Sequence, residues 1–268
     1  MEPVRPEFVP DPSLSRAEME ALQGDIAEAA VFEDDLDFDP DAVSLDRDAD
    51  QQTLGSDAEQ ISFDDDSPVV VGVDQAFLDD RAVSAVVALR DGEVIEEVTA
   101  VEPVEIPYIP GLLSFREGNA ILAAFQKLSV TPDLAVVDGS GRIHFREAGL
   151  ATHVGVTLDL PAVGVAKNLL CGTPATTIPE RMAEGARLAI EADADVTAPD
   201  GTVIGYAFQS RQYDSGSTSI NPLYVSPGHR IGAETAVDVV ERCCGGYKLP
   251  EPTRLADQLA DEAKADLR

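Results

Sequence analysis

Two short apolar runs of the sequence end in an aspartate. Val69–Asp74 reads VVVGVD and Leu134–Asp138 reads LAVVD, a pattern typical of buried strands. Ligands of α/β sheets gather at the carboxyl ends of strands, so neighbouring strands would bring Asp74 and Asp138 together. Two unpaired carboxylates in one cleft repel each other, which favours a hard cation such as Mg²⁺ between them. Each aspartate taken alone is also explained by a turn or a loop cap.

Glu117 is the third acid of interest. It follows Ser114 in an S-x-x-E capping box, at the start of a helix that we expect to run to Leu128, and this box alone would explain it. The preceding PYIPG loop, 107–111, holds two prolines and a glycine in five residues, so it is rigid. This loop brings one aromatic side chain, Tyr108, close to Arg116 and Glu117.

The segment DGSGRIHFREAGLATH, which begins at Asp138, combines glycines with cationic donors. Gly139 and Gly141 allow a ligand to approach the main chain closely, and the donors are Arg142, His144, Arg146 and His153. An ordinary surface turn with solvated charges is the alternative.

Two further side chains follow expected strands. Lys167 comes after AVGVA, where it could face the same cleft or serve only as a solubilising charge. His229, in SPGH, could reach the cleft or be a hydrogen-bonded core histidine.

The elements that must position these residues predict an α/β fold with a mixed sheet. Asp91-Gly92 between two apolar stretches indicates a β-hairpin. Alternating helices and strands follow, as in mixed sheets. Besides the two runs above, we expect strands at Ala82–Arg90, Glu93–Val101, Ala162–Ala166, Val203–Phe208 and Leu223–Val225, and helices at Ala148–Leu158, Gly232–Arg242 and Thr253–Ala265.

An acidic N-terminal extension, residues 1–66, precedes this unit of residues 67–268. Residues 14–31 form an expected amphipathic helix, with Ser15 and Glu18 as a capping box. Residues 32–66 lack apolar periodicity, and we expect a flexible, solvated linker there.

The composition restricts the class of protein. The chain has 268 residues and a formal charge of −31, from 19 basic and 50 acidic side chains. No apolar run approaches the ~18 residues that span a bilayer, and the N-terminus does not resemble a signal peptide. Three cysteines, including the adjacent Cys243 and Cys244, cannot by themselves make a disulfide framework or a four-ligand zinc site. We therefore expect a cytoplasmic protein without membrane contact.

The acidity extends over the whole chain. Residues 1–66 hold 21 acids against three arginines, the remainder is also acidic, and only four lysines stand beside fifteen arginines. This balance favours a protein of a halophile, because concentrated salt shrinks the screening length to about 3 Å. An acidic tail on an ordinary protein is the alternative. By composition alone, nucleic acid would be a poor choice of partner.

The motifs nevertheless closely resemble the endonuclease V family in their order along the chain. These motifs are VGVDQAF, PYIPGLLSFREG, the run from PDLAVVDGSGRIH to NLLCG, YVSPGHRI and KLPEPTRLAD. The resemblance covers roughly residues 68–260 and is densest from 103 to 172, whereas residues 173–200 and the N-terminal extension depart from it. It implies a ribonuclease-H-like fold and a deoxyinosine-directed DNA repair nuclease.

The resemblance also implies roles for single residues. Asp74 and Asp138 would hold a catalytic Mg²⁺, for which Mn²⁺ could substitute, and Glu117 would be the third metal-binding acid. Tyr108 would be a wedge in the duplex. His144, Lys167 and His229 match further active-site positions, whereas His153 does not. From the residues themselves we expect Gly111, Gly139 and Arg116 to contact the substrate.

The resemblance further implies hydrolysis of the second phosphodiester bond 3′ to deoxyinosine, which leaves a 3′-hydroxyl and a 5′-phosphate. We expect the protein to be a monomer. Two alternatives remain open from the sequence. An inosine-directed ribonuclease could use the same site, and a protein that binds the lesion without cutting would be a different class.

Overall fold

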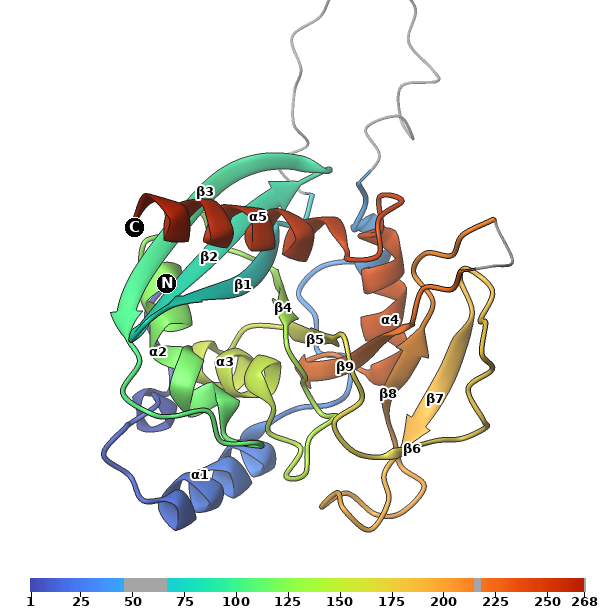
Figure 1. Cartoon of the computed structure of the whole chain (residues 1–268), viewed down its shortest axis with the longest axis horizontal. Helices are drawn as coiled ribbons and strands as arrows, with labels where there is room; N and C mark the ends of the chain where they lie inside the picture. Colours follow the sequence, from blue (N-terminus) through green and yellow to red (C-terminus); the bar gives the residue numbers. More distant parts are fainter. Residues whose placement is uncertain (46–66, 215–217, 268) are drawn as a thin grey trace, which may run out of the picture.

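The computed structural model describes residues 1–45, 67–214 and 218–267. Its centre is a mixed sheet, and the strand order within the described residues is β3-β2-β1-β4-β5-β9-β8-β7-β6 (Figure 1). Strands β1 (Val70–Leu78), β2 (Arg81–Arg90) and β3 (Glu93–Pro103) form an antiparallel meander. Strands β4 (Leu134–Asp138) and β5 (Ala162–Ala166) continue the sheet parallel to β1.

The other half of the sheet is antiparallel throughout. It consists of β9 (Leu223–His229) beside β5, then β8 (Val203–Phe208), β7 (Arg187–Glu191) and the short β6 (Thr173–Pro174). The predicted mixed sheet is therefore confirmed, including the hairpin at Asp91-Gly92. Strands β6 and β7 lie in the stretch from 173 to 200, for which we predicted no element.

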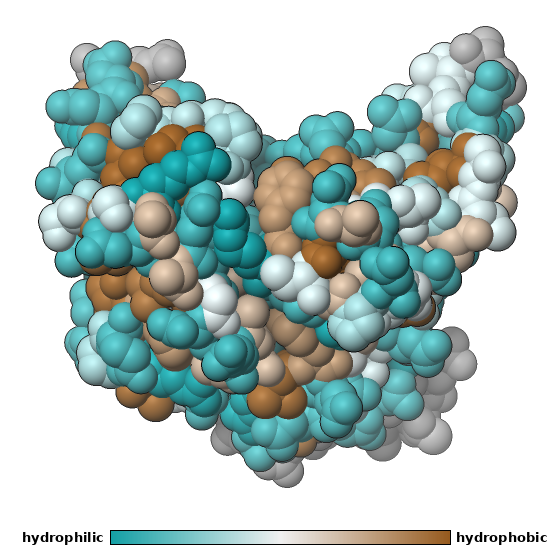
Figure 2. Space-filling view, turned by 90° about the horizontal axis from the view of Figure 1, so that it is seen from below, coloured by the Kyte–Doolittle hydropathy of each residue, from teal (hydrophilic) through white to brown (hydrophobic). Residues whose placement is uncertain are grey.

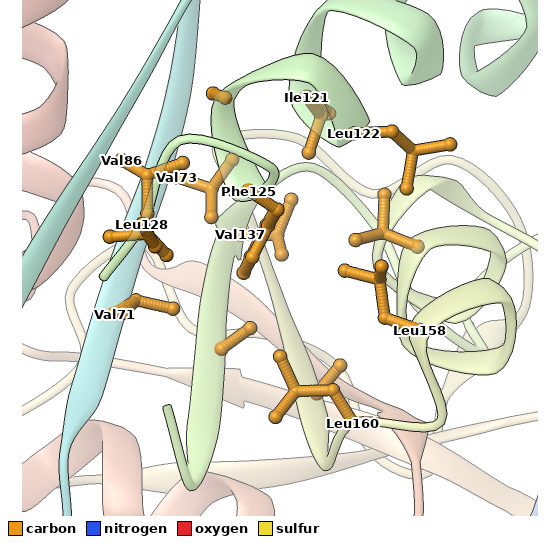
Figure 3. Packing of buried hydrophobic residues seen from close by; sticks show 14 of the residues in the cluster. Val71, Val73, Val86, Ile121, Leu122, Phe125, Leu128, Val137, Leu158 and Leu160 are labelled. Carbon is orange, nitrogen blue, oxygen red and sulfur yellow. The ribbon is translucent and has the colours of Figure 1, made fainter. Parts of the chain in front are cut away.

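Helices cover both faces of the sheet. Helices α2 (Leu113–Phe125) and α3 (Leu150–Leu158) pack on one face, whereas α4 (Ala233–Arg242) and α5 (Glu251–Asp266) pack on the other. Figure 3 shows the first interface, where valines of β1, β2 and β4 meet apolar side chains such as Phe125 and Leu158. Burying each such side chain contributes roughly 1.5–3 kcal/mol.

Strand alternation decides which side chains face α5. Val71 and Val73 point to α2 and α3, so Val70, Gly72 and Asp74 point the other way. A Cβ at Gly72 would lie 1.9 Å from the carbonyl oxygen of Pro252, so the first turn of α5 rests directly on β1. Only glycine permits this close approach.

The N-terminal region wraps around the sheet domain. Phe8, in the short helix η1 (Pro6–Phe8), is buried, and α1 (Arg16–Ala29) begins with the predicted Ser15–Glu18 capping box. The region continues through η2 (Pro40–Ala42) to Val43, which is buried beside α4. The face seen in Figure 2 is mainly hydrophilic and is hollowed between two projecting lobes.

The described part of the predicted linker is not a solvated chain. Asp34 accepts hydrogen bonds from Gly232 and Thr235, and Arg230 pairs with Asp35 and Asp37. Carboxylates of residues 32–45 therefore bind hydrogen-bond donors near α4 and hold this segment on the domain. Such polar contacts cannot be predicted from apolar periodicity. Residues 46–66 of the predicted linker lie outside the described residues.

Two local predictions need correction. Asp74 does not end its strand, because β1 continues to Leu78. Ser114 does not cap α2: the N-cap is Leu112, no side chain caps this helix, and both Ser114 and Glu117 are buried. Glu117 is therefore not explained by capping. Among the described helices, none is long and apolar enough to cross a membrane.

Candidate functional site

Asp74 and Asp138 lie side by side on the sheet. Parallel pairing of Val73 with Val137 puts the next residue of each strand, Asp74 and Asp138, in adjacent positions. Both point to the face covered by α5, as strand alternation requires. The pairing register therefore brings the two carboxylates together although Asp74 is inside its strand.

The two aspartates are held close against their mutual repulsion. Asp74 is only 7 % exposed. Burial and the charge of Asp138 raise the pKa of Asp74 well above its usual range, although a hydrogen bond from its neighbour Gln75 opposes this. A buried carboxylate beside a half-buried one is unfavourable when both are ionised, and a bound cation relieves this repulsion.

Asp257 joins this pair from α5, and sequence reasoning missed it. Its carboxyl is within hydrogen-bonding reach of Asp74 and helps to raise the pKa of that residue. It lies beside Thr253, Ala256 and Ala260, which form the buried face of α5. The sequence did contain a signal for Asp257: this carboxylate lies next to the small residues of an apolar helix face, inside the KLPEPTRLAD motif.

Lys167 binds the acids from the end of β5. Its Nζ donates to Oδ2 of Asp138 at 2.7 Å. Partial burial alone would lower the pKa of Lys167, but the hydrogen bond to Asp138 and the charges of Asp74 and Asp257 raise it above its usual value. Lys167 is thus a cation at the acid cluster, which we define as Asp74, Glu117, Asp138 and Asp257.

Glu117 lies on α2, which covers the other face of the sheet, and the charge of Asp138 acts on it. It is 6 % exposed. Burial, with a smaller contribution from the charge of Asp138, raises the pKa of Glu117 to about 8, although Arg116 opposes this. A carboxyl with such a pKa can exchange a proton near neutral pH.

The acid cluster fits a magnesium ion that keeps much of its water. Within residues 1–45, 67–214 and 218–267, no three Asp, Glu, His or Cys side chains converge on one point closely enough to hold an ion as they stand. Mg²⁺ does not need such a cage, because one or two carboxylates, waters and substrate phosphates complete its octahedron. Asp74 and Asp138 are the residues placed to serve as these carboxylates.

A cavity of about 70 Å³ opens beside the N-terminus of α2, and we call it the Tyr108 cavity. This volume exceeds the ~10–15 Å³ that one water needs. Its lining combines apolar side chains with main chain and includes Gln23, Tyr108, Gly111, Ser140, His144, Gly149, Leu150 and Leu170. Tyr108 is 67 % exposed, so its ring is accessible from solvent at the mouth of this cavity.

Gly111 and His144 form one wall of this cavity. Gly111 has φ +80°, which favours glycine, and its carbonyl accepts a hydrogen bond from Nε2 of His144 at 3.1 Å. The other ring nitrogen, Nδ1, accepts from the Arg146 N–H. Burial lowers the pKa of His144 to about 4, so the ring is neutral and serves the wall of the cavity.

Gln23 of α1 braces the same wall and was also missed from the sequence. Its Nε2 donates to the Gly111 carbonyl at 2.8 Å, and its Oε1 accepts from Arg146. Gln23 shares the buried face of α1 with Met19 and Ile26. The sequence signal for Gln23 was a single amide on an otherwise apolar helix face. Its hydrogen bond to Gly111 makes α1 part of the wall of the cavity.

Gly139 and Arg116 make hydrogen bonds within the protein. The Gly139 N–H donates to Val165, and the neighbouring Ser140 is the residue that lines the cavity. Arg116 donates to the Ile106 carbonyl at 2.7 Å and lies over the Phe77 ring. Arg116 therefore anchors the start of the rigid loop, whereas we predicted substrate contact.

The structure separates His229 from the acid cluster. His229 pairs with Ala162 at the far end of β5, three residues or roughly 10 Å from the position that pairs with Asp138. The ring is fully buried; Nδ1 accepts from the Val31 N–H and Nε2 donates to Asp159. His229 fastens the N-terminal region, in place of the catalytic role that we predicted.

His153, which matches no active-site position in the resemblance, has a structural position. Its Nε2 contacts the Phe8 carbonyl at 2.6 Å, and its ring meets Phe115 edge to face. Cys243 is buried and Cys244 is half-buried, and burial raises the pKa of both thiols to about 12, which leaves them protonated and unreactive.

Comparisons with known proteins agree with the resemblance seen in the sequence. The profile of the family described as Endonuclease V matches residues 54–258. The chain is 66 % identical to "Endonuclease V" of Haloarcula marismortui over 266 residues, which is 98 % of this chain and 97 % of the relative. It is 60 % identical to the protein of the same name from Natronomonas pharaonis, with 99 % and 98 % covered. Both organisms are halophilic archaea, as the charge balance predicted.

Solved structures give the same result for the fold. The endonuclease V structure from Streptomyces avermitilis has a TM-score of 0.73 at 29 % identity, and the match covers 100 % of this chain and 99 % of that one. Endonuclease V of Ciona intestinalis, solved with a DNA containing an inosine followed by a ribo-adenosine, has a TM-score of 0.70 at 23 % identity, with 94 % and 98 % covered. These neighbours confirm the predicted ribonuclease-H-like fold.

Proposed function

The chain belongs to the endonuclease V family, and we propose that it is a metal-dependent DNA repair endonuclease that cuts beside deoxyinosine. The cut falls at the second phosphodiester bond 3′ to the lesion and leaves a 3′-hydroxyl and a 5′-phosphate. One observation carries the proposal: a buried aspartate, Asp74, and a half-buried one, Asp138, lie in adjacent positions of a sheet that also carries a cavity with an exposed tyrosine. The Ciona relative, bound to inosine-containing DNA, supports the choice of ligand.

Asp74 and Asp138 would hold Mg²⁺, or Mn²⁺ in its place, with Asp257 behind them. A divalent ion there supplies stabilisation of the charge that develops on the scissile phosphate and on the departing 3′ oxygen. Lys167 adds a positive charge beside Asp138 and faces the same phosphate. Glu117, whose pKa burial raises to about 8, orients the attacking water and accepts its proton.

The Tyr108 cavity would receive the flipped hypoxanthine. Extruding a base costs a few kcal/mol and least for a weakly paired base, which favours deaminated adenine over normal bases. Tyr108 fills the vacated space by stacking. The main chain around Gly111, fixed by Gln23 and His144, presents the edge that the base contacts.

The acidic surface limits how the enzyme binds DNA. Counterion release gives ordinary DNA-binding proteins most of their affinity, and concentrated salt removes it. With a formal charge of −31, this protein depends instead on metal–phosphate contacts, stacking and the base cavity.

The test is to map the cut on a labelled duplex with one deoxyinosine, with and without Mg²⁺, beside a matched RNA with one inosine. We expect a Mg²⁺-dependent nick in the DNA that vanishes in Asp138→Ala while binding persists. Asp261→Asn, which removes one exposed carboxylate of α5, is the control and should nick normally. Cutting only of RNA would favour the ribonuclease alternative, and binding without any cut would favour a lesion-binding protein.

A further inference from the structure

A second cavity adjoins the acid cluster, and the proposed chemistry does not use it. It has a volume of about 360 Å³ and lies where β5 and β8 end and β9 begins (Figure 1). We call it the Tyr224 cavity, and its lining includes Lys167, Asn168, Leu169, Ile220, Asn221 and Tyr224.

The two cavities are separated by one short segment that follows β5. Leu170 lines the Tyr108 cavity, whereas Lys167, Asn168 and Leu169 line the Tyr224 cavity. Lys167 also contacts Asp138 at 2.7 Å. The acid cluster therefore borders the Tyr224 cavity at Lys167, and a strand whose lesion lies in the first cavity can continue past the acids into the second.

The lining has the composition of a nucleoside site. Tyr224 is a half-buried aromatic side chain, Leu169 and Ile220 are half-buried and apolar, and Asn168 and Asn221 are exposed amides. Aromatic rings stack on any base, and amides hydrogen-bond to base edges or sugars. Glu180, the one acid of the described lining, is exposed to solvent.

Positive charge gathers at this cavity in a chain that is otherwise acidic. Ser210 donates to the Lys248 carbonyl, so Lys248 sits next to Gln209, which is also in the lining. Partial burial and the nearby charge of Lys167 lower the pKa of Lys248. Lys167 lines the cavity, and Lys248 lies outside the lining but close enough for the charge of Lys167 to act on it, so two of the four lysines of the chain are near each other. Their mutual repulsion is relieved when an anion lies between them.

We infer that the Tyr224 cavity binds the substrate nucleotide immediately 3′ of the cleaved bond, with its base against Tyr224 and a backbone phosphate facing Lys248. This inference rests on the proposed function, because the cut one nucleotide beyond the lesion sends that nucleotide past Lys167. The cavity then holds the departing 5′-phosphate end of the product strand and aligns the scissile phosphate with the acid cluster.

The first experiment crosses protein variants with substrates. Asn221→Trp fills the cavity from an exposed loop position, and Lys248→Ala removes the charge. Lys264→Ala, on α5, removes the same charge far along that helix. Each protein cuts three deoxyinosine duplexes: an intact one, one with an abasic residue just 3′ of the cut, and one with an abasic residue two positions further on.

We expect the first abasic residue to lower kcat/KM of the wild type about tenfold, a typical contribution of one stacked base. Asn221→Trp should lose a similar factor on the intact duplex and nothing more on the first abasic duplex. Lys248→Ala should raise KM while Lys264→Ala and the distant abasic residue change little. The inference would be overturned if the losses of kcat/KM caused by Asn221→Trp and by the first abasic residue multiplied when combined. It would also be overturned if the first abasic residue left kcat/KM of the wild type unchanged. In both cases the nuclease proposal would stand. A wild type that cuts no deoxyinosine duplex would overturn both.

A second measurement does not depend on activity. The chain contains no tryptophan, so Tyr224→Trp places a single tryptophan, whose emission can be excited apart from that of the tyrosines, in the cavity. In the Asp138→Ala background, which should bind the duplex without cutting it, the intact duplex should quench its emission and the first abasic duplex should not. Equal quenching by both duplexes would contradict stacking at this position.

Discussion

Glutamine at position 117 should stabilise the metal-free protein at high pH while it abolishes cutting. The buried site favours the protonated carboxyl, so Glu117 contributes its full stability below its ordinary pKa of 4.5, and this contribution is lost as the pH rises toward 8. A rise of the pKa from 4.5 to about 8 corresponds to at most about 5 kcal/mol of unfolding free energy. Glutamine has nearly the same shape and never ionises.

The assay is urea unfolding of wild type and Glu117→Gln in concentrated KCl with EDTA, at about pH 5 and about pH 9. The comparison between pH values matters, because any constant effect of the substitution cancels. We expect the variant to gain several kcal/mol over the wild type between the two pH values. Glu28→Gln, on the exposed side of α1, controls for the loss of one negative charge from the chain. An equal difference in unfolding free energy between variant and wild type at both pH values would refute the claim that burial disfavours the ionised form of Glu117.

Three further predictions concern other parts of the molecule. Tyr108→Ala should raise KM for the deoxyinosine duplex about tenfold through lost stacking, whereas Tyr108→Phe should stay near wild type; equal losses would show that the hydroxyl matters. His229→Ala should lower the unfolding free energy by roughly 1–3 kcal/mol, because Val31 and Asp159 lose a buried partner, and the pH profile of cutting should keep its shape; a lost basic or acidic limb would restore His229 to catalysis. Duplex affinity should fall about tenfold or less over a salt range that costs basic DNA-binding proteins about 10³-fold or more; a steep loss would contradict the halophile interpretation of binding.

The sheet and its order of elements were largely predictable, because local patterns control them. The apolar runs of β4 and β5 and the Asp91-Gly92 turn mark strands by residue type alone, and their bounds agree with the structure. What sequence patterns could not supply was pairing register. Asp74 and Asp138 meet because Val73 pairs with Val137, although the predicted reason, that both strands end there, holds only for β4.

The incorrect and missing site predictions share a physical cause. In the sequence, a polar side chain that hydrogen-bonds inside the protein cannot be distinguished from one that is exposed to solvent. Gln23 and Asp257 lie on helix faces that pack on the domain. His229 donates to the Asp159 side chain, and Arg116 donates to the Ile106 carbonyl. The carboxylates of residues 34–37 likewise read as a solvated run, yet they dock that segment on Arg230, Gly232 and Thr235. Long-range contacts decide the partners of such side chains. The sequence indicates at most that a polar residue shares an apolar helix face, as Gln23 and Asp257 do.

Binding of Mn²⁺ followed by electron paramagnetic resonance tests the central claim most directly, that Asp74 and Asp138 together hold the metal. Concentrated KCl suppresses weak binding to the acidic surface. The account predicts saturable binding by the wild type and by Asp261→Asn, and its loss in Asp74→Asn and Asp138→Asn, each checked for an intact fold by circular dichroism. Saturable binding that survives both of the latter substitutions, or a wild type that binds no Mn²⁺, would contradict it.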